Sequence, residues 1–83
     1  MTTKTERSLV ELKSGEKALI LRLEGGEAFR KKLAALNIRV GKTIKKVTAQ
    51  PFLGPVVIEI DNTEATLGRK MAENIFVQAL EAQ

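Results

Sequence analysis

The chain has 83 residues and a net charge of +4, and it contains neither cysteine nor histidine. This length supports a single domain, and the lack of cysteine excludes disulfides and thiolate metal sites. The lack of histidine removes the commonest metal ligand and the usual general base at neutral pH. No run approaches the ~20 apolar residues that a membrane helix needs. We therefore expect a cytoplasmic protein, whose action at a membrane would depend on recruitment to its inner face by a partner.

The first third of the chain combines polar segments with one short strand. Residues 1–8 are polar, and we expect them to be flexible. Ser8 and Glu11 have the spacing of a capping box, which predicts one helical turn that plugs the end of a barrel. Residues 17–24 follow as a strand that is apolar on both faces in its middle, so both faces should be covered.

One α-helix is predicted over residues 27–36. Phe29, Leu33 and Leu36 recur at spacings of four and three, which places them in one apolar stripe. Asn37 follows the last periodic residue, and asparagine tolerates the left-handed conformation that ends many helices. We expect Leu33 and Leu36 to belong to the hydrophobic core.

The second half of the chain predicts short strands. Residues 42–49 form a strand with a bulge or bend between Ile44 and Val47, because these two apolar residues are three apart. Further strands are expected at 56–61, 64–67 and 75–79, with a loop over 50–55, a helical turn over 68–74 and a tail over 80–83. Among these strands, Ile58 and Ile75 are assigned to the core. Four glycines are assigned to structural turns: Gly26, Gly41, Gly54 and Gly68. The pattern predicts a mainly β fold, a small five-stranded barrel with one α-helix and short helical turns.

An ordered set of glycines and aliphatic residues runs through most of the chain. It reads Arg30-x-x-Leu33-x-x-Leu36-Asn37-Ile38-x-x-Gly41-x-x-Ile44, then Gly54-Pro55, Leu67-Gly68 and Ala72-x-x-Ile75-x-Val77. This set resembles the FeoA family, the small cytosolic accessory proteins of bacterial ferrous iron transport. The chain departs from the family pattern at Asn37, where glycine is usual, and at Lys46, where an aliphatic residue is expected. We expect the Lys46 stem to pack while its ammonium group reaches water.

The resemblance implies a fold and a function. The fold would be an SH3-like barrel over residues 9–79. The function would be that of a non-enzymatic accessory protein that binds the membrane ferrous iron transporter with a cytosolic GTPase domain, the FeoB type, and modulates or assembles it. No tightly bound cofactor is expected, and any association with Fe(II) would be weak or indirect. Self-association stays open.

The basic residues favour one stretch of the chain as a contact surface. Residues 28–58 contain no acidic side chain and hold half of the 14 basic ones. Such an asymmetry suggests a positive face, although a solvated surface with no partner is the alternative. Arg30 and Lys31 on the helix, together with Phe52 and Leu53 at a loop tip flanked by prolines, are our candidates for partner binding. The alternative for Phe52 is that it folds back onto the barrel.

Other kinds of site have weaker support. Glu59, Asp61 and Glu64 cluster near a turn, but their spacing does not match a calcium loop, and ferrous iron prefers sites with imidazole or thiolate. Catalysis is not expected, because no nucleophile has a recognisable base beside it. A nucleic-acid-binding or regulatory module is the alternative function, since basic charge favours phosphate contacts. The chain has three Phe and no Tyr or Trp to stack on bases, so we do not expect nucleic acid as the partner.

Overall fold

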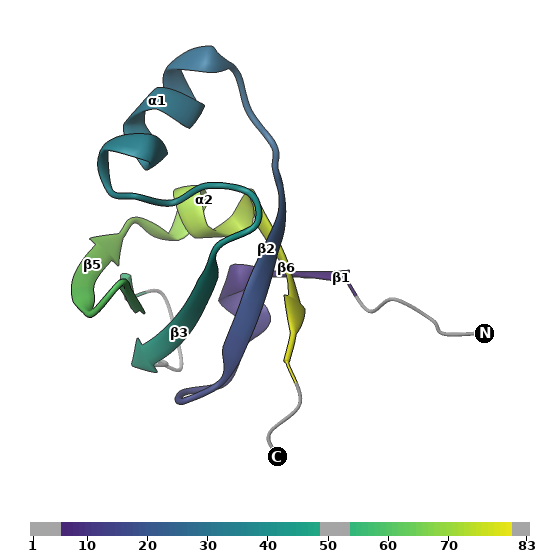
Figure 1. The fold of residues 1–83 in the computed structure, drawn as a ribbon, viewed down its shortest axis with the longest axis vertical. Coiled ribbons are helices and arrows are strands. Elements are labelled where there is room, and N and C mark those ends of the chain that lie inside the picture. The colour runs from purple at the N-terminus through teal and green to yellow at the C-terminus, as the bar shows by residue number, and fades with distance from the viewer. Residues whose placement is uncertain (1–5, 49–53, 81–83) are drawn as a thin grey trace.

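The computed structural model describes residues 6–48 and 54–80, which form one antiparallel six-stranded sheet in the order β1-β6-β2-β3-β4-β5. The elements, shown in Figure 1, are β1 (Glu6–Ser8), the 3-10 helix η1 (Leu9–Glu11), β2 (Lys17–Leu23), α1 (Glu27–Ala35), β3 (Thr43–Thr48), β4 (Val56–Ile60), β5 (Thr63–Leu67), α2 (Arg69–Glu73) and β6 (Ile75–Ala79). The predicted mainly β class is confirmed. Within the described residues, no helix is long and apolar enough to cross a membrane.

The predicted number of five strands is wrong, because β1 adds a sixth. Residues 6–8 were expected to be flexible, but they pair antiparallel with β6 at the edge of the sheet, with Ser8 opposite Phe76. Ser8 also begins η1, where its hydroxyl oxygen accepts a hydrogen bond from the Val10 amide, as the capping pattern predicts. The same hydroxyl donates to the carbonyl oxygens of Ala72 and Glu73 at the end of α2. The polar segment of residues 6–8 is therefore held in place by contacts with β6 and α2, which its composition alone does not indicate.

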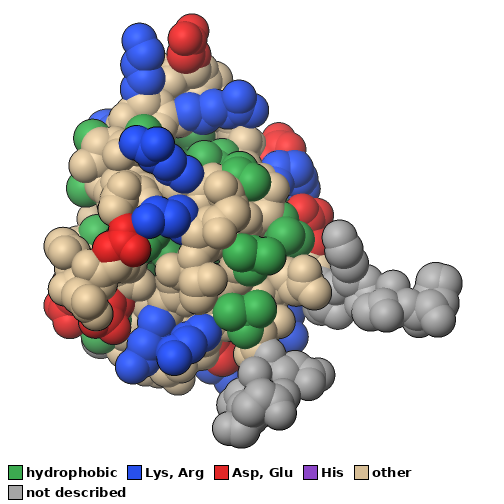
Figure 2. All heavy atoms as spheres, viewed as in Figure 1, with side chains coloured by type: hydrophobic (Ala, Val, Ile, Leu, Met, Phe, Trp, Pro, Cys, Tyr) green, Lys and Arg blue, Asp and Glu red, His purple; other side chains and the backbone are tan. Residues whose placement is uncertain are grey.

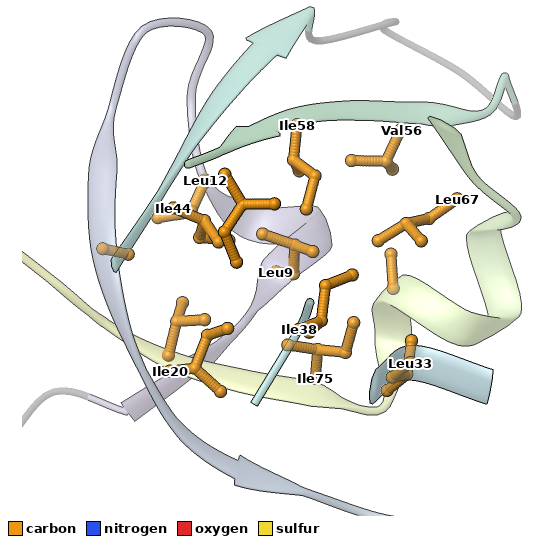
Figure 3. Close-up of a cluster of buried hydrophobic side chains, with 14 of the residues drawn as sticks. Leu9, Leu12, Ile20, Leu33, Ile38, Ile44, Val56, Ile58, Leu67 and Ile75 are labelled. Atoms are coloured by element: carbon orange, nitrogen blue, oxygen red, sulfur yellow. The ribbon is translucent and has the colours of Figure 1, made fainter. Parts of the chain in front are cut away.

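The hydrophobic core lies inside the curved sheet, where the side chains in Figure 3 point toward one another. Every strand except β1 contributes to it, and so do η1, both α-helices and the segment after α1. The core assignments of Leu33, Ile58 and Ile75 are confirmed, since all three are fully buried. The assignment of Leu36 is wrong, because 38% of this residue is exposed.

The turn after α1 explains why Leu36 is not in the core. Asn37 adopts φ 69°, and its amide donates to the carbonyl of Ala34, while the amide of Ile38 donates to the carbonyl of Leu33. This is the Schellman arrangement, in which a left-handed residue reverses the chain at the helix end. It brings Ile38, which is 1% exposed, back beside Leu33. Ile38 therefore occupies the core position that helical periodicity alone assigns to Leu36.

The remaining turns follow the residues that form them. Gly41 has φ 96° within a turn closed by a hydrogen bond from the Lys42 amide to the Arg39 carbonyl. Asp61 and Asn62 both have positive φ and connect β4 to β5 as a two-residue hairpin. A bulge in β3 is predicted between Ile44 and Val47, and the register with β4 shifts slightly later, between Lys46 and Thr48. The other predicted turn glycines precede regular elements: Gly26 before α1, Gly54 in the segment before β4, and Gly68 before α2.

Candidate functional site

The exposed side of α1 carries a run of three basic residues. Arg30, Lys31 and Lys32 are all exposed, and in the part of the chain that the structure describes no ion pair to a carboxylate is found for any of them. Glu27 lies in the first turn and Lys32 in the last, so both charges interact favourably with the helix dipole. Figure 2 shows Lys and Arg side chains gathered over the α1 end of the molecule. This end can therefore attract a negatively charged partner.

A shallow open groove of about 650 Å³ runs between α1 and α2. Its lining combines Phe29 and Met71, both half-buried and packed against the core, with Ala28, Lys31 and Lys32. The lining thus combines apolar side chains from both helices with two lysines of α1. Such a surface is suited to binding a protein segment, because it offers both an apolar contact and charge complementarity.

Gly25 determines how Phe29 sits in this groove. A Cβ atom at position 25 would clash with Cδ2 of the Phe29 ring, far inside normal contact distance. The lack of a side chain at Gly25 lets the Phe29 ring pack against the backbone of the β2–α1 connection. Gly25 therefore shapes the groove, whereas a Cβ atom at Gly26 would meet no neighbouring atom.

Lys46 behaves differently from the prediction. Its ammonium group does not reach water: the residue is 4% exposed, and Nζ donates to the carbonyl oxygens of Val10 at 3.0 Å and Leu12 at 2.8 Å. Burial lowers the pKa of Lys46 below its ordinary value of 10.5; the nearby Arg69 guanidinium lowers it further, and Glu16 opposes the shift. Lys46 lies on the same face of β3 as the buried Ile44, so alternation of the strand places it inside. It holds η1 against the barrel and belongs to the scaffold rather than to a binding surface.

The acidic residues around the β4–β5 hairpin do not gather into a metal site. Asp61 is paired with the Lys42 ammonium at 2.5 Å and accepts a hydrogen bond from the Asn37 side chain. Glu59 and Glu64 lie opposite each other on β4 and β5. Among the described residues, no group of three or more His, Cys, Asp or Glu side chains is arranged to hold a metal ion. Asp61 instead ties the hairpin to the end of α1.

The structure brings only some of the predicted contact residues together. Arg30 and Lys31 lie on α1, whereas Phe52 and Leu53 lie outside the described residues, so their position relative to α1 stays a prediction. Sequence reasoning missed Met71 and the contribution of Lys32 to the groove. The short helix α2 agrees with the helical turn predicted over 68–74, but nothing in its spacing indicates that it lines a groove with α1.

Comparisons with known proteins agree with the sequence resemblance. A protein of Porphyromonas gingivalis described as an "Fe(2+) transport protein A/Fe(2+) transporter FeoB fusion protein" is 36% identical over 72 residues, which cover 87% of this chain and 8% of that protein. The chain thus spans a small part of this curated relative.

Solved structures share the fold. A crystal structure of an iron uptake regulatory protein (FeoA) superposes with a TM-score of 0.86 at 26% identity, over 92% of this chain and all of the other. The solution structure of iron(II) transport protein A from Clostridium thermocellum has a TM-score of 0.81 at 32% identity, over 88% of this chain and 45% of the other. These neighbours confirm the expected SH3-like fold.

The sequence profile of the FeoA domain matches residues 7–79, nearly the whole barrel. The chain therefore belongs to the FeoA domain family, whose members are linked to ferrous iron transport.

Proposed function

We propose that this protein is a non-enzymatic accessory protein of ferrous iron uptake that binds the cytosolic part of a FeoB-type transporter. The observation that carries the proposal is the Porphyromonas gingivalis relative, in which a segment similar to this chain is joined to a FeoB transporter. Covalent linkage raises the effective concentration of two modules to about the millimolar range, which is useful when the modules act together. In this proposal Fe(II) is the cargo of the transporter, and the accessory protein itself needs no resident metal.

The contact surface in this proposal is the exposed side of α1. Arg30 and Lys31 can attract an acidic surface from a distance, which raises the association rate and selects among partners. Phe52 and Leu53, which lie outside the described residues, remain candidates for an apolar contact.

Modulation requires that the protein distinguish between conformations of its partner. A GTPase domain has different conformations with GDP and with GTP, and a ligand shifts such an equilibrium only by its difference in affinity for the two. Equal affinity for both would make the protein an assembly factor, because it would leave the populations unchanged.

Calorimetric titration with the purified GTPase domain of the transporter from the same organism tests this proposal. We expect saturable binding whose affinity differs between the GDP state and the state with a GTP analogue. Equal saturable binding would support assembly without nucleotide control. No binding to this domain or to the detergent-solubilised transporter would contradict the proposal.

A further inference from the structure

The apolar face of α1 is only partly covered by its own domain. Leu33 is fully buried, Phe29 is half-buried and Leu36 is 38% exposed. With 3.6 residues per turn, Phe29, Lys32 and Leu36 lie on one side of the helix, next to the inward-facing Leu33. This side includes the groove, because Phe29 and Lys32 line it. The helix therefore presents an apolar edge that the barrel leaves open.

The opposite side of the groove adds a second apolar group. Met71 of α2 lies half-buried in the lining, packed against the core. Methionine adapts its shape to different apolar partners, and it is common at surfaces that bind amphipathic helices. Phe29 and Met71 together can accept one or two apolar side chains from a bound segment.

The charge around the groove indicates what the rest of that segment carries. The two helices contain five cations and two carboxylates: Arg30, Lys31, Lys32, Arg69 and Lys70 against Glu27 and Glu73. One of the carboxylates, Glu73, is already paired with Arg69 at 3.6 Å. Lys31 and Lys32 line the groove itself. A bound segment is therefore complementary if it carries carboxylates beside its apolar side chains.

We infer that the α1–α2 groove is the docking site for an acidic amphipathic segment of the transporter's cytosolic part, which inserts an apolar side chain between Phe29 and Met71 and places carboxylates against Lys31 and Lys32. The inference rests on the proposed function and specifies the surface and the kind of segment. A nucleic acid backbone satisfies the charge but offers no apolar group to cover Phe29 and Met71. The observations therefore favour a protein segment.

The test is a binding titration of the purified cytosolic part of the transporter with four forms of the full chain. These are the wild type, Met71→Glu, the double variant Lys31→Glu/Lys32→Glu, and the control Lys13→Glu/Lys17→Glu. The control pair is exposed, and Lys17 begins β2, at the end of that strand opposite to α1 (Figure 1). The two double variants change the net charge equally, so the comparison separates the groove from overall charge. Thermal melts of all four forms check that each variant is folded.

We expect Lys31→Glu/Lys32→Glu to weaken binding by about tenfold or more at low salt, with a smaller loss at high salt, because salt screens exposed charges. Met71→Glu should weaken binding by a similar factor at both salt concentrations, since it places a carboxylate at the apolar contact. The control should stay within about twofold of the wild type, as is usual for charges remote from a contact. Binding that survives in both groove variants would overturn the inference and leave the proposed function intact. Failure of the wild type to bind would instead contradict the proposed function.

Discussion

Replacing Lys46 by methionine should destabilise the protein, although the change removes a buried charge. The Lys46 ammonium donates to the carbonyl oxygens of Val10 and Leu12, and hydrogen bonds from charged groups contribute about 1.5–3 kcal/mol each. Methionine is similar in length and apolar, so it fills the space but leaves both carbonyls without this donor. The variant therefore separates hydrogen bonding from packing.

The net effect is smaller than the sum of the two bonds. In the variant, water can replace the ammonium at the Val10 carbonyl, because that bond is only partly buried. The Leu12 bond is buried, and an unsatisfied buried acceptor costs about 1–3 kcal/mol. Removing the ammonium also removes the cost of burying a charge, which is the effect that lowers the pKa of Lys46. We therefore expect the free energy of unfolding to fall by about 1–3 kcal/mol, and the melting temperature of a domain this size to fall by about 4–8 °C per kcal/mol.

Urea unfolding followed by far-UV circular dichroism measures this loss, since the chain has no Trp or Tyr for fluorescence. A Lys46→Met variant as stable as the wild type, or more stable, would refute the reasoning. It would mean that desolvation of the ammonium outweighs its two hydrogen bonds, as it does for some buried ion pairs.

The pH dependence of the same pair of proteins gives an independent check. Burial lowers the pKa of Lys46 in the folded state below 10.5, so between the lowered pKa and 10.5 the unfolded chain binds a proton that the folded chain has released. Stability rises with pH wherever the unfolded state binds more protons. The wild type should therefore gain stability relative to Lys46→Met as the pH rises through this window, and the difference should be constant below it. Other titrating groups cancel in the comparison. If the stability of the wild type relative to Lys46→Met falls as the pH rises through this window, the pKa of Lys46 is not lowered in the folded state.

Three further predictions concern α1 and the hairpin beside it. Leu33→Ala should lower the free energy of unfolding by about 2–5 kcal/mol, because it leaves a cavity at the one fully buried residue of α1; a melt within a few degrees of the wild type would show that Leu33 does not hold the helix. Asp61→Asn should lower the free energy of unfolding by less than about 1 kcal/mol, since it weakens the exposed pair with Lys42 while asparagine still tolerates positive φ. Urea titrations at low salt and in about 1 M NaCl test this, because the loss should vanish at high salt, where such pairs are screened. A loss that persists at high salt would contradict the prediction. Reversing Arg30 and Lys31 to glutamate should leave the melting temperature within a few degrees and weaken transporter binding measured by calorimetry; full affinity at physiological salt would exclude these residues from the contact.

Much of the fold could be predicted because local patterns and tertiary structure agree in most of the chain. The alternation that places Ile58 in the core and the spacing that points Leu33 inward both follow from element geometry. Leu36 shows where this reasoning ends: its spacing fits the stripe, but the Schellman turn at Asn37 places Ile38 beside Leu33 instead. Helical periodicity does not include the chain reversal that follows the helix.

Polar residues were harder to place, because their environment depends on distant segments. Lys46 is buried because the carbonyls of Val10 and Leu12, more than 30 positions earlier, accept hydrogen bonds from its ammonium group. Residues 6–8 are ordered because β6 offers them a partner at the other end of the chain. Neither long-range partner is encoded in local composition.

The candidate site was predicted in part. Clustered charge in the sequence indicated the basic residues of α1, and the structure places Arg30 and Lys31 on its exposed side. The groove could not be predicted, since it arises from the approach of α1 to α2, and Met71 acquires its place only in the folded chain.

The most direct test of the account is the initial rate of Fe(II) uptake in cells of the organism that encodes this protein. The rate is measured in the wild type, in a strain lacking the gene, and in that strain expressing either the wild-type protein or Arg30→Glu/Lys31→Glu at equal levels. We predict that deletion lowers uptake, that the wild-type protein restores it and that the variant does not. Unchanged uptake after deletion would contradict a role in ferrous iron transport. Full restoration by the variant would contradict action through the basic side of α1.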